Sequence, residues 1–169
     1  RIRQATRYRE TLTKLVVVGV TGSYGKTTTK EYLAHILSAH APTAKTPSHV
    51  NVDTGVAKTL LQTVKPHHKY FVVEMGAYRR GEIADICRIV KPSLGIITAI
   101  SNQHLELFGS QDQLTATKLE LFEAIATDQG RIANSESPLL VVACEKIVYN
   151  PLWYGREDHS ALQPADIKR

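Results

Sequence analysis

The amino-acid sequence predicts an α/β fold, with a mainly parallel sheet that is covered by helices on both faces. Short runs rich in valine and isoleucine, typical of strands buried on both faces, alternate with segments whose apolar residues recur at helical spacing. Strands that alternate with helices imply crossover connections and hence a parallel sheet. The 169 residues, 43% of them hydrophobic, suit a single compact domain.

The first half of the chain contains two predicted strands and two predicted helices. In order, they are a strand at residues 15–20, a helix that follows Lys26 and is closed by Pro42, a helix from Asp53 to Pro66, and a strand at residues 70–73. Both strands are short apolar runs, and each proline marks a helix end because it cannot continue the backbone hydrogen bonding. Asp53 is expected to cap its helix.

The second half continues the alternation. In order, we expect a helix at residues 81–91, a strand at 94–100, a helix at about 112–126 and a strand at 131–133. Residues 139–144 could form a strand by composition, but Ser137 as cap and Pro138 at the first position favour a helix. A short strand and loops are expected beyond Val148.

The formal charge of +5 is concentrated in residues 1–14, which contain five basic residues and one acidic residue. This segment is interpreted as a solvated basic leader or linker, followed by one domain at residues 15–169. A phosphate-rich ligand would also suit a basic domain, so the charge does not indicate nucleic acid, and no nucleic-acid partner is expected.

The sequence has no run that approaches the roughly 18 apolar residues of a membrane-spanning helix, and its N-terminus lacks the apolar stretch of a signal peptide. A cytoplasmic location is therefore expected, with no membrane span. The chain begins without methionine and ends without an obvious terminal element, which indicates a piece of a longer protein.

The strongest functional signal is the loop at residues 21–28, between the first strand and the first helix. Its glycines let backbone N–H groups and the helix N-terminus face an anion, while Lys26 offers a mobile charge to phosphates and Thr27 offers a hydroxyl to Mg²⁺. Val20 stands where the strict pattern has its first glycine, and the alternative is an ordinary glycine turn that caps a helix. The residues expected to contact the nucleotide are Thr21, Gly22, Ser23, Gly25, Lys26, Thr27 and Thr28.

Two polar side chains, Glu74 and His104, follow predicted strands. Ligands bind at the carboxyl ends of strands in an open parallel sheet, so Glu74 could reach Mg²⁺ on the phosphates of ATP. The alternative is a carboxylate at the rim with no role. His104 follows the next predicted strand at the same edge, and is either a ligand or a surface histidine.

Lys118 is expected on the apolar stripe of its helix, because it lies four residues from both Leu114 and Phe122. In one interpretation its stem packs against the core and its amine reaches water. In the other, burial lowers the pKa of the amine, and the neutral amine reacts with CO₂ to form a carbamate that can bind metal.

These motifs together resemble the Mur ligase family, the ATP-dependent enzymes that build the peptide of bacterial cell-wall precursors. The matching stretches are residues 20–28, 73–77 with 81–83, 104–110 and 117–120. They are most similar to the MurF branch, which joins D-alanyl-D-alanine to a UDP-N-acetylmuramoyl tripeptide. The resemblance covers residues 15–169 and implies the P-loop NTPase-like central domain of the family, without its N- and C-terminal domains.

The resemblance also implies roles for the residues above. Lys26 and the loop amides would bind the β and γ phosphates of ATP, and Thr27 with Glu74 would bind one Mg²⁺. His104 would join a second metal site, supported by Lys118 as a carbamylated lysine. These groups would stabilise charge on the transferring phosphoryl group.

Two asparagines complete the implied site. Asn134, at the end of a predicted strand, would contact adenine, and Asn51 would lie in the loop that approaches the acyl substrate. In the implied reaction, ATP phosphorylates a substrate carboxylate, and an amine then attacks the acyl phosphate.

Three functions are compatible with the sequence. The first is the central domain of a MurF-like ligase, which binds MgATP but does not ligate in isolation. The second is a ligase with the same central domain, of the folylpolyglutamate or cyanophycin synthetase type; residues 81–83 and 104–110 argue against it. The third is a nucleotide-binding module without catalysis, against which the presence of Glu74, His104 and Lys118 counts.

Overall fold

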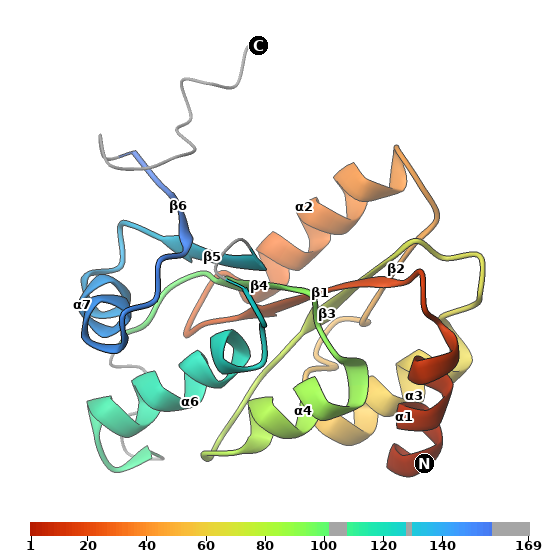
Figure 1. The fold of residues 1–169 in the computed structure, drawn as a ribbon, viewed down its shortest axis with the longest axis horizontal. Coiled ribbons are helices and arrows are strands. Elements are labelled where there is room, and N and C mark those ends of the chain that lie inside the picture. The colour runs from red at the N-terminus through yellow and green to blue at the C-terminus, as the bar shows by residue number, and fades with distance from the viewer. Residues whose placement is uncertain (102–107, 128–129, 157–169) are drawn as a thin grey trace.

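A six-stranded parallel sheet forms the centre of the molecule in the computed structural model, which describes residues 1–101, 108–127 and 130–156 (Figure 1). The strand order is β2-β3-β1-β4-β5-β6. The strands are β1 (Val16–Thr21), β2 (Thr43–Lys45), β3 (Tyr70–Glu74), β4 (Leu94–Ile97), β5 (Arg131–Asn134) and β6 (Leu152–Tyr154). The predicted parallel sheet is therefore confirmed.

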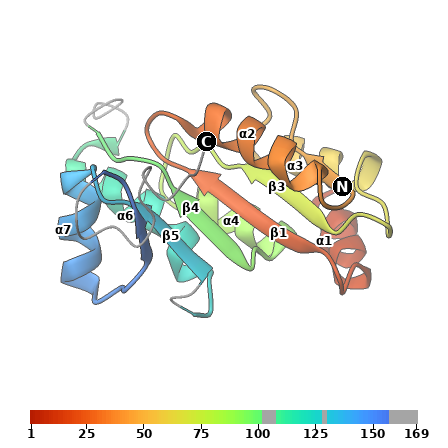
Figure 2. The same cartoon turned by 90° about the horizontal axis from the view of Figure 1, so that it is seen from above.

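Helices cover both faces of this sheet, as the sequence predicts (Figures 1 and 2). The described helices are α1 (Ile2–Thr11), α2 (Lys26–Ser38), α3 (Asp53–Gln62), α4 (Glu82–Val90), α6 (Gln111–Glu123) and α7 (Pro138–Ile147). Helix α2 packs on one face, where Ala34 meets Val18 and Val20 of β1. Val17, which precedes these two valines, points to the opposite face and joins the core formed with α1, α3 and α4.

The clearest differences from the prediction concern β4, β2 and α3. Strand β4 stops at Ile97 instead of residue 100, because the backbone beyond it bonds to the phosphate loop: the Ser23 N–H donates to the Ala99 carbonyl at 2.8 Å. Strand β2 was not predicted, and it contains one buried residue, Ala44. Asp53 is the first residue of α3, and Val52 occupies the cap position that the sequence assigns to Asp53.

The sequence favours a solvated leader for residues 1–14, whereas the structure folds most of this segment into α1. Ala5 is fully buried, and the Tyr8 hydroxyl donates to the Val64 carbonyl at 2.9 Å. The Arg9 guanidinium donates to the carbonyls of Val90 and Leu12, at 2.6 and 2.8 Å, beside the ends of α4 and α1. Part of the charge that suggested solvation, the Arg9 guanidinium, thus donates hydrogen bonds to backbone carbonyls, one of them distant in sequence.

Helix α6 approaches the sheet closely through Leu121. Gly19 of β1 lies opposite Gly95 of β4, and we refer to these two residues as the glycine pair. A β-carbon at Gly19 would lie 2.7 Å from Leu121 Cδ1, and one at Gly95 would lie 2.9 Å from Leu121 Cγ. The absence of side chains at both positions therefore makes room for Leu121, which is fully buried.

Candidate functional site

The phosphate loop connects β1 to α2 and depends on glycine. At Gly22 the φ angle is 144°, and a β-carbon there would lie 2.2 Å from Thr98 Oγ1. That hydroxyl holds the loop by donating to the Tyr24 carbonyl at 2.6 Å. Thr21, at the start of the loop, is buried and donates through Oγ1 to the Met75 carbonyl at 2.9 Å. Neighbouring strand ends therefore fix the shape of the loop.

The N-terminus of α2 faces outward at the end of this loop. Gly25 is the cap residue, with a φ of 80°, and it has no side chain with which to cap the first N–H groups of the helix. These N–H groups and the positive end of the helix dipole form a favourable place for an anion. Thr27 and Thr28 lie in the first turn and are exposed.

Lys26 lies beside the loop, with its ammonium donating to the carbonyls of Gly22 and Ser23 at 2.9 and 3.0 Å. Burial lowers the pKa of Lys26, while the negative charge of Glu74 raises it. The side chain can thus move between loop carbonyls and a bound phosphate with little displacement.

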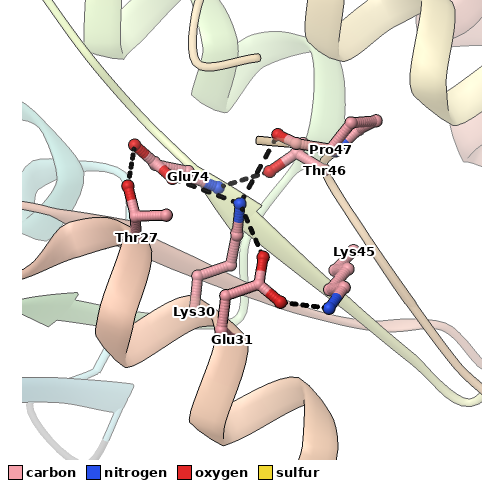
Figure 3. A network of polar contacts seen from close by, with 7 residues as sticks. All are labelled: Thr27, Lys30, Glu31, Lys45, Thr46, Pro47 and Glu74. Atoms are coloured by element: carbon pink, nitrogen blue, oxygen red, sulfur yellow. Dashed lines mark hydrogen bonds and ion pairs between the residues drawn. The ribbon is translucent and has the colours of Figure 1, made fainter. Parts of the chain in front are cut away.

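Glu74, at the end of β3, joins the loop to the neighbouring strand (Figure 3). The side chain is buried, and Oε1 accepts a hydrogen bond from Thr27 Oγ1 at 3.1 Å. Its backbone N–H donates to Thr46 Oγ1 at 3.0 Å. Oε2 lies 3.3 Å from the ammonium of Lys30. A hydroxyl and a carboxylate oxygen at this spacing suit Mg²⁺, which often binds few protein ligands and takes phosphate oxygens and water for the rest.

A pocket of about 200 Å³ brings five predicted residues together: Gly22, Ser23, Lys26, Asn51 and Lys118. Lys26, Asn51 and Lys118 come from separate segments of the chain and line the same pocket beside the loop. The Gly76 N–H donates to the Asn51 carbonyl at 2.7 Å, and a β-carbon at Gly76 would lie 2.8 Å from Asn51 Cγ. Glycine at this position therefore allows the asparagine side chain to approach the pocket.

Lys118 is 5% exposed, so its amine is not extended into water as the snorkelling interpretation requires. Its pKa is lowered to about 8, mainly by burial and also by the positive charge of Lys26, while the carboxylates of Glu120 and Glu82 oppose the change. Its amine lies 5.8 Å from the centre of the Phe108 ring. A lysine with this pKa has an appreciable neutral, nucleophilic fraction near neutral pH.

The predicted site residues that the structure describes outside this pocket are Thr21, Gly25, Thr27, Thr28, Glu74 and Asn134. His104 falls outside the described residues. Asn134, at the end of β5, donates through Nδ2 to the Thr98 carbonyl at 2.9 Å and accepts from the Glu136 N–H at 2.9 Å. Among the residues that the structure describes, no group of three or more His, Cys, Asp or Glu side chains could hold a metal ion.

Sequence reasoning missed three residues of the site. Lys30 is fully buried and pairs with Glu74. Thr98 holds the phosphate loop, and the Glu120 carboxylate accepts from the N–H groups of Gly81 and Ala84 at 2.6 and 3.0 Å, at the start of α4. Lys30 could have been found, since it lies one helical turn after Lys26 on the same side of the helix. The other two contacts join segments distant in sequence.

None of the described helices combines the length and the apolar character needed to cross a membrane.

Known proteins resemble this chain in sequence and fold. A UDP-N-acetylmuramoyl-tripeptide--D-alanyl-D-alanine ligase from Synechocystis sp. is 35% identical over 163 residues, which cover 96% of this chain and 34% of the relative. The crystal structure of MurF from Acinetobacter baumannii matches with a TM-score of 0.86 and 33% identity, covering 99% of this chain and 36% of that one. MurF from Thermotoga maritima in complex with ADP matches with a TM-score of 0.79 and 32% identity, covering 92% and 37%. This chain thus spans about a third of the length of these relatives.

The model of the Mur ligase middle domain matches residues 20–169. The match begins within β1 and includes the phosphate loop, Glu74 and Lys118. The sheet and helices described above agree with the solved MurF structures over almost the whole chain. This chain therefore belongs to the Mur ligase family, as its middle domain.

Proposed function

We propose that this chain is the ATP-binding middle part of a longer ligase, which joins D-alanyl-D-alanine to a UDP-N-acetylmuramoyl tripeptide. The observation that carries the proposal is the pocket in which Lys26, Asn51 and Lys118 meet beside the phosphate loop. The activity of the Synechocystis relative supports the choice of substrates, and the ADP bound by the Thermotoga relative supports the choice of nucleotide. We place this activity in the cytoplasm.

The nucleotide would bind with its phosphates at the N-terminus of α2. The loop N–H groups and Lys26 would hold the β and γ phosphates, since both the helix end and the ammonium attract negative charge. We assign the adenine contact to Asn134, at the end of β5. Thr27 and Glu74 would hold Mg²⁺, whose oxygen preference their side chains fit. The ion would supply charge that stabilises the transferring phosphoryl group.

The reaction has two steps. A substrate carboxylate attacks the γ phosphorus of ATP, which gives an acyl phosphate and ADP. The amine of D-alanyl-D-alanine then attacks the acyl carbon, forms the amide bond and releases phosphate. Asn51 would orient the carboxylate, and Lys26 would stabilise negative charge as the phosphoryl group moves. We further propose that Lys118 is carbamylated and, with His104, supports a second metal ion.

Titration calorimetry tests the nucleotide site. The chain is titrated with a non-hydrolysable ATP analogue, with Mg²⁺ or with EDTA, beside Lys26→Ala and an exposed control, Lys58→Met. We expect binding that Mg²⁺ strengthens, loss of binding in Lys26→Ala, and no change in Lys58→Met. Equal affinity of Lys26→Ala and the unaltered chain would contradict the assignment of the phosphate site.

Ligation is tested on the longer protein that carries this chain. Phosphate release is measured with ATP and the UDP-linked tripeptide, with and without D-alanyl-D-alanine. Release that requires the dipeptide supports the proposed substrates. Release that requires glutamate and a folate instead would favour a ligase of the folylpolyglutamate type.

A further inference from the structure

Lys30 is a fully buried lysine that is not among the residues assigned to the phosphates (Figure 3). It lies in α2, one turn beyond Lys26, and its ammonium points into the space between α2 and β3. A buried ammonium is costly unless it is paired, so the partners of Lys30 indicate why the charge is there.

Lys30 contacts two carboxylates and one carbonyl. Its ammonium lies 3.3 Å from Glu74 Oε2, 3.2 Å from Glu31 Oε1 and 3.4 Å from the Pro47 carbonyl, to which it donates. The Glu31 side chain is 41% exposed and also pairs with Lys45, so water and a second cation can balance its charge. The Glu74 side chain is 4% exposed, so water cannot balance its charge in the same way, and it interacts with Lys26 through charge alone, whereas it forms an ion pair with Lys30. The partner that needs Lys30 is therefore Glu74.

The two carboxylate oxygens of Glu74 have different surroundings. Oε1 faces the phosphate loop and accepts from the Thr27 hydroxyl. Oε2 is buried and has no hydrogen-bond partner among the described residues, so the ammonium of Lys30 is the charge that balances it. If Lys30 were neutral, the carboxylate would keep its hydrogen bond from Thr27 but would lose the ion pair that holds Oε2 and so restrains rotation about the last side-chain bond.

We propose that Lys30 is a positioning residue for the carboxylate of Glu74, and that it directs Oε1 toward Thr27 so that these two oxygens can bind Mg²⁺ together with nucleotide. The inference rests on the proposed function of this site. Groups that orient a metal-binding carboxylate usually change metal affinity by about ten- to a hundredfold when they are removed. Lys30 also ties α2 to the segment after β2, through the Pro47 carbonyl.

Calorimetry with Lys30→Met tests the proposal on the same chain. The affinity for the non-hydrolysable ATP analogue is measured in EDTA and in Mg²⁺. We expect the affinity in EDTA to change by less than about threefold, and the strengthening by Mg²⁺ to fall about tenfold or more. The matched control is Glu31→Gln, which removes the other, exposed carboxylate beside Lys30 and should keep the full Mg²⁺ effect.

A merely structural role is separated by the affinity in EDTA. Loss of the Glu74 orientation alone should leave that affinity within about threefold, whereas a general disturbance of α2 would weaken nucleotide binding with and without Mg²⁺. If Lys30→Met does not fold, Lys30→Gln replaces it, because a neutral amide keeps a donor for Oε2 but loses the charge. A full Mg²⁺ effect in folded Lys30→Met or Lys30→Gln overturns the inference. Absence of a Mg²⁺ effect in the unaltered chain instead contradicts the proposed function of the site.

Discussion

Replacing Lys118 by methionine is expected to raise the free energy of unfolding near neutral pH. The residue is 5% exposed, and burial is the main reason that its pKa falls from 10.5 to about 8. At about 1.4 kcal/mol for each pH unit, this difference corresponds to about 3 kcal/mol of destabilisation of the folded chain. Loss of the contact with the Phe108 ring, at 5.8 Å, would offset about 0.5–1 kcal/mol. We therefore expect a net gain of about 2 kcal/mol in Lys118→Met.

The gain should depend on pH in a defined direction. Below pH 8, Lys118 is protonated in both the folded and the unfolded chain, so the full destabilisation is present. Between pH 8 and 10.5 the unfolded chain binds the proton and the folded chain does not, so the unaltered protein becomes more stable as pH rises. The difference between the variant and the unaltered chain should thus fall to about half at pH 9.5.

Urea denaturation followed by circular dichroism measures this difference, at pH 7 and pH 9.5, in buffer freed of CO₂ so that the amine stays unmodified. Lys58→Met, at an exposed position of α3, is the control and should change the free energy of unfolding by less than about 0.5 kcal/mol. A Lys118→Met chain no more stable than the unaltered protein at pH 7 would refute the reasoning, because it would mean that the ammonium is solvated.

Three further changes test other parts of the structure. Gly22→Ala would place a β-carbon 2.2 Å from Thr98 Oγ1 at a φ of 144°, so calorimetry should show about a hundredfold weaker binding of the ATP analogue; unchanged binding would contradict the loop geometry. Leu121→Ala should lower the free energy of unfolding by about 3–5 kcal/mol in urea, and a loss below about 1 kcal/mol would contradict its close packing. Burial raises the pKa of Cys87 to about 12 and that of Cys144 to about 11, so neither thiol should react with Ellman's reagent at pH 8 until the chain is unfolded; rapid reaction of the folded chain would contradict their burial.

The parts of the fold that sequence predicts well are determined by neighbouring residues. Strand β1, the phosphate loop and α2 follow one another directly, and their apolar spacing and glycines are visible over residues 15–37. Lys118 was placed on the inner face of α6 by helical spacing alone, and the structure confirms its burial.

The parts that sequence does not predict depend on distant partners. Strand β2 has three residues and exists through its pairing with β3, which composition does not reveal. The sequence of helix α1 is typical of a solvated basic segment, because it does not show that Arg9 donates a hydrogen bond to the carbonyl of Val90, far along the chain. Helical spacing places Lys30 on the same side of α2 as Lys26, but the sequence does not show its contact with Glu74, which lies on another element.

The glycine pair under Leu121 affects the position of Lys118 at the edge of the sheet. Leu121 and Lys118 lie one turn apart on α6, so the depth at which Leu121 packs also sets the distance between Lys118 and the phosphate loop. A methyl group added at Gly19 or Gly95 would push the helix outward and carry the lysine with it. Two positions in the core of the sheet can therefore adjust the distance between Lys118 and the phosphate loop while the loop itself stays unchanged.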